Sequence, residues 1–123
     1  MKSLNVVVLQ SDSVIAQSLL DSLRHSFPSV RAAVSLREVR ASIARNRAEV
    51  VVVDMEVASL KEVAELSREF PKAWIVCTHR LADEEMWTAA LSAGAADVCP
   101  SSDTRAILSA ALRSSSEARS AAA

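Results

Sequence analysis

The chain has 123 residues, of which 50% are hydrophobic and 24% are charged. This length and composition are typical of one globular domain with a complete hydrophobic core. The formal net charge of −1, from 14 basic and 15 acidic residues, provides no strong field for binding nucleic acid or an anionic membrane, so we expect neither as a partner.

The N-terminal part predicts a strand followed by a helix. The apolar run at residues 5–9 is too short for a secretion signal or a membrane span, so we expect the first strand of a cytoplasmic protein. Residues 13–26 carry apolar side chains at helical spacing, and Pro28 ends that helix. Ser11 and Ser13 are both candidates for its N-cap.

The next segments repeat this order. Residues 30–34 predict a short second strand, and residues 35–38 match the S-x-x-E capping box that opens a helix. Residues 49–54 then form an almost continuous apolar run that ends in Asp54. Such a run is typical of a strand buried on both faces. Residues 59–62 form a second S-x-x-E box and begin the following helix.

Two further strand and helix pairs complete the chain. Residues 74–78 predict the fourth strand, residues 83–94 the fourth helix and residues 96–99 a short fifth strand, with a last helix behind it. Gly94 is the only glycine, and it lies where a helix C-terminus needs a left-handed residue. A chain with one glycine has no glycine-rich loop for binding nucleotide phosphates.

The alternation of strands and helices predicts a parallel α/β sheet with helices on both faces. We expect a flavodoxin-like (βα)5 three-layer sandwich with a five-stranded sheet in the order 2-1-3-4-5. Residues 1–113 make up this domain, and residues 114–123, which lack an apolar stripe, predict a flexible tail or a truncated linker. The polar residues expected at the carboxyl edge of the sheet are Gln10, Ser11, Asp12, Asp54, Glu56 and Thr78.

Three segments resemble the receiver domain of two-component response regulators, and the resemblance covers about residues 4–113. Residues 51–56, Val-Val-Val-Asp-Met-Glu, resemble its phosphoacceptor strand, and residues 75–78 resemble its strand that ends in Thr or Ser. Residues 91–97, Leu-Ser-Ala-Gly-Ala-Ala-Asp, resemble the A-G-A-x-D signature after its fourth helix. The resemblance implies a non-enzymatic signalling domain with Asp54 as candidate phosphoacceptor and Thr78 as the candidate hydroxyl contact to the phosphoryl group.

Two parts of that family's site differ in this sequence. Where the family has two adjacent acids that hold Mg²⁺, the chain has Gln10 and Ser11, and Asp12 follows one position later, where helix N-capping is the favoured role. Where the family has a lysine that binds the phosphoryl group, followed by a proline, counting from Gly94 places Ser101 and Ser102. A loop shorter by two residues would place Cys99 and Pro100 there instead, also without a cation. Magnesium is therefore only a weak expectation. The candidate ligands are Asp12, Asp54 and Glu56.

These departures predict an atypical receiver domain, or pseudo-receiver, that acts in signal transduction through protein–protein interaction, with phosphorylation impaired or lost. The alternative is a working phosphorelay receiver that accepts a phosphoryl group on Asp54 from a histidine kinase. The expected partner is a kinase, an output protein or a second copy of the chain in a homodimer. Met86 and Trp87 are candidate interface residues, and packing of Trp87 against the sheet is the alternative.

The two cysteines, Cys77 and Cys99, leave one further alternative. Without a secretion signal they predict neutral core thiols and no disulfide framework. Cys77 is followed closely by His79 and Arg80, which could activate a thiolate nucleophile. Its place inside an apolar strand favours an inert thiol, so we do not expect an enzyme.

Overall fold

The computed structural model describes the backbone of residues 4–122 and the side chains of residues 4–114. Strands and helices alternate along the chain. They are β1 (Asn5–Leu9), α1 (Ser13–Arg24), β2 (Ser29–Ala33), α2 (Leu36–Asn46), β3 (Ala48–Asp54), α3 (Leu60–Glu69), β4 (Trp74–His79), α4 (Glu84–Ser92), β5 (Asp97–Pro100) and α5 (Thr104–Ala122). All strand pairs are parallel, and the sheet has the order β2-β1-β3-β4-β5. The predicted fold class and strand order are confirmed.

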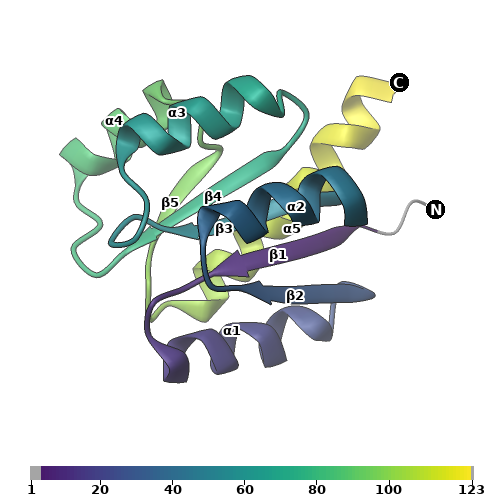
Figure 1. The fold of residues 1–123 in the computed structure, drawn as a ribbon, viewed down its shortest axis with the longest axis horizontal. Helices are drawn as coiled ribbons and strands as arrows, with labels where there is room; N and C mark the ends of the chain where they lie inside the picture. Colours follow the sequence, from purple (N-terminus) through teal and green to yellow (C-terminus); the bar gives the residue numbers. More distant parts are fainter. Residues whose placement is uncertain (1–3, 123) are drawn as a thin grey trace.

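The sheet is covered by helices on both faces (Figure 1), and each face has its own hydrophobic core. Leu23 of α1 and Ile107 of α5 belong to the core on one face, and Val39 of α2 and Leu66 of α3 belong to the core on the other. The valines at residues 50–53 of β3 alternate between the two cores, and each is 0% exposed. The run is therefore apolar at every position because both faces of β3 are buried.

Helix α1 is capped by Asp12, and not by Ser11 or Ser13 as two of the sequence candidates suggested. The Asp12 carboxylate accepts hydrogen bonds from the backbone N–H groups of Val14 at 2.9 Å and Ile15 at 3.1 Å. Aspartate is among the strongest N-cap residues because its oxygens satisfy exposed N–H groups of the first turn. The cap leaves the Ser11 side chain available for another partner.

The two predicted capping boxes differ in the structure. At α3 the box is complete, since Ser59 accepts from Glu62 N–H and the Glu62 carboxylate accepts from Ser59 N–H. At α2 Ser35 caps the helix, but the Glu38 carboxylate accepts from Val34 N–H. The second half of the predicted α2 box is therefore wrong. Glu38 accepts from the N–H of Val34, the residue before the cap, and not from the N–H of Ser35.

Two helix ends adopt positive φ angles. Gly94 follows α4 with φ 112°, and a Cβ built there would lie 2.2 Å from the Ser67 hydroxyl oxygen. Only glycine fits this close approach of the chain to α3. Helix α2 ends at Arg47 with φ 55°, a left-handed conformation that costs a non-glycine residue about 1–2 kcal/mol.

Helix α5 continues past residue 113, where the sequence predicts the end of the domain. The side chains of residues 115–122 and all of Ala123 lie outside the described residues, so the division into domain and tail stays a prediction. Within residues 4–122, no helix combines the length and apolar composition that a membrane crossing requires.

Candidate functional site

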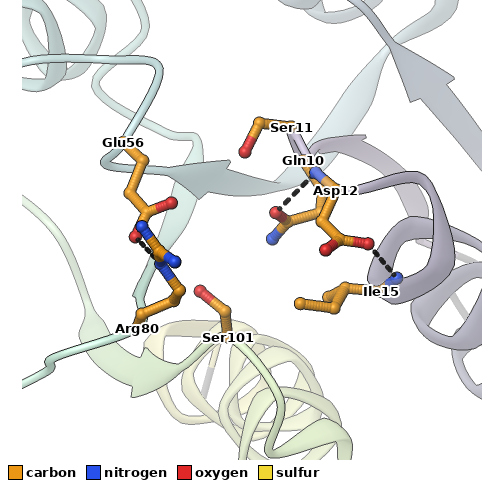
Figure 2. A pocket seen from close by; sticks show the side chains of 7 residues that line it. All are labelled: Gln10, Ser11, Asp12, Ile15, Glu56, Arg80 and Ser101. Atoms are coloured by element: carbon orange, nitrogen blue, oxygen red, sulfur yellow. Dashed lines mark hydrogen bonds and ion pairs between the residues drawn. The ribbon is translucent and has the colours of Figure 1, made fainter.

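The carboxyl edge of the sheet contains a polar cleft of about 280 Å³. The loops that follow β1, β3, β4 and β5 supply its walls, as Figure 2 shows from close by. The polar side chains that line it are Gln10, Ser11, Asp12, Glu56, Arg80 and Ser101. This is the edge at which ligands of open parallel sheets bind.

Asp54, the last residue of β3, lies fully buried next to this cleft with an exposed fraction of 0%. Its Oδ2 accepts hydrogen bonds from the Ser11 hydroxyl at 2.6 Å and from Ser11 N–H at 3.0 Å. Its Oδ1 accepts from Glu56 N–H at 2.8 Å. Both carboxylate oxygens are therefore bonded to donors of the chain itself, and these bonds join the β1–α1 loop to the end of β3.

Thr78 lies beside Asp54, since the two residues are paired in register between β4 and β3. The Thr78 hydroxyl is fully buried and lies 3.5 Å from the Gln10 side-chain N–H group, a long hydrogen bond. The Gln10 side-chain oxygen accepts from Asp12 N–H at 3.2 Å. The structure thus brings Asp54 and Thr78 together, with Gln10 between Thr78 and the start of α1.

The remaining candidates for magnesium ligands, Asp12 and Glu56, each use one carboxylate oxygen for a partner within the chain. The Asp12 carboxylate caps α1, and Glu56 forms an ion pair with Arg80, whose Nε lies 2.7 Å from Glu56 Oε1. Among the described residues, no three His, Cys, Asp or Glu side chains are grouped closely enough to hold one metal ion. Magnesium binds through hard oxygens in near-octahedral geometry. It commonly uses one or two carboxylates and completes its coordination with water, so magnesium binding by Asp12, Asp54 and Glu56 stays a prediction, and we assign no step to a metal ion.

Arg80 lines the cleft, whereas the sequence suggested it only as a possible activator of the Cys77 thiol. It follows β4 and brings a positive charge to the cleft, although its side chain is 76% exposed. Its hydrogen bond to the Glu56 carboxylate and the charge of that group raise the pKa of Arg80. Its position two residues after Thr78, at the same strand end, was the available signal.

Ser101 follows β5 at the position where the resemblance places a lysine. The residue is 3% exposed, and within the described part of the chain its hydroxyl oxygen has no hydrogen-bond partner. Figure 2 shows this hydroxyl directed into the cleft, between Arg80 and Gln10. An unpaired buried hydroxyl costs about 1–3 kcal/mol, so Ser101 is an unusual feature of this edge.

The two thiols belong to the cores and not to the cleft. Burial raises the pKa of Cys77 to about 12 and the pKa of Cys99 to about 11. Cys77 packs in one core and Cys99 in the other, on opposite faces of the sheet. Both thiols stay protonated near neutral pH, which argues against the thiolate nucleophile.

Helix α4 presents one of the two predicted interface residues to solvent. Trp87 is 45% exposed, and its indole N–H donates to Asp97 Oδ1 at 3.1 Å. Arg113 of α5 binds the other oxygen of Asp97 at 2.5 Å. Met86 is partly buried against the core next to α3 and α4. Of the two candidates, Trp87 therefore presents the larger exposed apolar surface.

No protein-family profile matches the chain, and no curated protein matches it. Solved structures do match. The N-terminal signal receiver domain of a two-component response regulator from Bacteroides fragilis has a TM-score of 0.82 and 19% identity, over 92% of this chain and 97% of that one. A response regulator from Thermotoga maritima has a TM-score of 0.81 and 18% identity, over 92% and 98% of the two chains.

The RcsB response regulator of Salmonella typhimurium has a TM-score of 0.81 and 14% identity. The match covers 96% of this chain and 62% of the RcsB chain, so this chain spans less than two thirds of that protein. At such identities the three matches show a shared fold.

Proposed function

We propose that this chain is an atypical receiver domain, which transmits a signal through protein–protein contact while phosphorylation is impaired or lost. The fold it shares with response-regulator receiver domains supports the signalling role. One observation supports the atypical form. The buried Asp54 carboxylate has both oxygens bonded to Ser11 and to the backbone of Glu56.

Phosphoryl transfer to an aspartate makes three demands on the site. A carboxylate oxygen must be free to attack, and a metal ion must offset the repulsion between carboxylate and phosphoryl oxygens. A cationic side chain must also hold the phosphoryl group. Here the Ser11 hydroxyl occupies Asp54 Oδ2, and Ser101 stands where the resemblance places the lysine. The missing contacts are those to a metal ion and to a lysine, at about 1.5–3 kcal/mol each. Their loss is expected to lower the rate of phosphoryl transfer about 10² to 10⁴-fold.

The alternative is a phosphorylatable receiver that accepts a phosphoryl group on Asp54. One observation favours it, since the register pairs Asp54 with Thr78 and so places a buried hydroxyl beside the carboxylate. Arg80 could then supply part of the missing positive charge, provided that it leaves Glu56. A histidine kinase would be the partner in this case.

A direct test separates the two functions. The chain is incubated with acetyl phosphate and Mg²⁺, and its intact mass is measured at neutral pH. We expect no phosphoryl adduct in the unaltered chain. A variant with Gln10→Asp and Ser11→Asp, which supplies adjacent acids and removes the Ser11 hydroxyl, is expected to gain reactivity. An adduct on the unaltered chain that Asp54→Ala removes would establish the alternative.

The partner in this proposal is a kinase, an output protein or a second copy of the chain, bound through the exposed face of Trp87. Large aromatic side chains that are partly exposed are frequent anchors of protein interfaces. Trp87→Ala should weaken association, as measured by light scattering over a concentration series and by binding to a candidate kinase. Leu112→Ala, which changes an apolar residue of α5 that is 42% exposed, is the matched control. An equal loss of association in both variants would contradict a special role for Trp87.

A further inference from the structure

The cleft at the carboxyl edge has more acidic than basic groups. Asp12 and Glu56 line it with their carboxylates, and Asp54 lies directly behind Ser11. The single guanidinium in its lining belongs to Arg80, which is held at its Nε by Glu56 and is 76% exposed. Three carboxylates against one guanidinium favour a cationic ligand over an anionic one.

Three acceptor oxygens face the interior of this cleft from three different loops. One oxygen of Asp12 accepts from the α1 backbone and one oxygen of Glu56 accepts from Arg80, while the second oxygen of each carboxylate points into the space between them (Figure 2). The third acceptor is the hydroxyl of Ser101.

The Ser101 hydroxyl indicates independently that a ligand binds here. Its oxygen is buried and has no partner among the described residues, and it is directed toward the cleft that Ser101 lines (Figure 2). Buried hydroxyl groups in native proteins are almost always hydrogen-bonded. A ligand with a donor group would satisfy this oxygen, whereas the neighbouring side chains of the chain do not.

We propose that this cleft binds a primary ammonium group, carried by a lysine side chain of another protein or by a free alkylamine. An ammonium group offers three N–H donors and a compact positive charge on an apolar stem. The donors match the oxygens of Asp12, Glu56 and Ser101, and the stem can pack on Ile15, which also lines the cleft. The proposal does not depend on whether Asp54 is phosphorylated, so it goes beyond the proposed function.

The test is an NMR titration of the intact ¹⁵N-labelled chain with n-butylammonium. Saturable shifts are expected at the amides of Ser101 and Glu56 and at the side-chain amide of Gln10. Tetramethylammonium, which has the charge but no N–H donor, and inorganic phosphate, which has the opposite charge, serve as comparison ligands. The same shifts with either of them, or shifts with butylammonium that do not saturate, would overturn the proposal.

Matched variants test the roles of the individual groups. Asp12→Asn keeps the helix cap and removes the charge, and Ser101→Ala removes the unpaired hydroxyl. Each is expected to weaken butylammonium binding about fivefold to tenfold, since each deletes one charge-assisted contact. Arg80→Gln removes the opposing cation and should strengthen binding. Glu85→Gln, an exposed acid in the first turn of α4, should leave the affinity unchanged.

Arg80→Gln is expected to raise the affinity for butylammonium, whereas a folding defect would lower it. This variant therefore separates an effect on binding from an effect on folding. Unchanged affinity in Asp12→Asn, or weaker binding in Arg80→Gln, would refute the assignment. A short peptide with one lysine and neutral ends distinguishes the two sources. Tighter binding of the peptide than of butylammonium supports a lysine of a protein partner, and equal binding supports a free amine.

Discussion

Replacing Ser11 by alanine tests the bond on which the proposed function rests. The substitution deletes the hydroxyl that donates to Asp54 Oδ2 across 2.6 Å and keeps the Ser11 N–H donor at 3.0 Å. Asp54 itself is 0% exposed, but Ser11 is exposed and lines the cleft, so water can replace part of the lost donor. A hydrogen bond to a charged group contributes about 1.5–3 kcal/mol. We therefore expect the free energy of unfolding to fall by about 1–2 kcal/mol, since water in the cleft offsets part of the lost bond.

The assay is urea unfolding followed by far-ultraviolet circular dichroism, with Ser11→Ala, Asp54→Asn and the double variant forming a double-mutant cycle. A coupling energy of about 1–2 kcal/mol between the two positions is expected for residues in direct contact. Ser13→Ala, at an exposed serine in the first turn of α1, should stay within about 0.5 kcal/mol. A loss below that size in Ser11→Ala, or the same loss when Asp54 is already changed, would refute the reasoning.

Three further predictions follow from the backbone and the thiols. Gly94→Ala should lower the free energy of unfolding by about 2–4 kcal/mol, since the new Cβ meets the Ser67 side chain at a residue with φ 112°. In urea unfolding, Ser67→Gly in the same chain should restore part of this loss, and no restoration would contradict the clash. Arg47→Gly should raise stability by about 1 kcal/mol by relieving the left-handed residue at φ 55°, whereas a lower melting temperature would contradict that strain. Burial raises the pKa of Cys77 to about 12 and of Cys99 to about 11. Above about pH 8.5 the unfolded thiols release protons that the folded chain keeps. The free energy of unfolding should therefore fall as the pH rises from about 8.5 toward 11 and 12. Urea unfolding of the Cys77→Ala, Cys99→Ala double variant should lack this part of the pH dependence, and an unchanged slope would rule out the thiols as its source.

The fold was predictable because its signals are long and mutually consistent. The fully apolar run at residues 50–53 requires burial on both faces, and helical stripes on either side require crossovers between parallel strands. Handedness and burial then leave few arrangements of such units. The position of Asp54 at the end of β3 and its pairing with Thr78 follow from the same reasoning.

The detailed contacts of the site were not predictable to the same degree. At the start of α1, Ser11, Asp12 and Ser13 compete for one capping position, and the choice depends on differences of about 1 kcal/mol. Only after Asp12 takes the cap does Ser11 become free to bind Asp54. The ion pair of Arg80 with Glu56 depends on the path of two loops, which periodicity does not describe.

Asp97 at the start of β5 holds the indole of Trp87 on one oxygen and the guanidinium of Arg113 on the other. These bonds favour one orientation of the Trp87 indole in the free chain. Ordering a side chain at an interface costs about 0.5–1.5 kcal/mol of conformational entropy. If Trp87 anchors a partner as proposed, part of this cost has already been met during folding, and the same contact area would give a tighter complex than a freely rotating tryptophan.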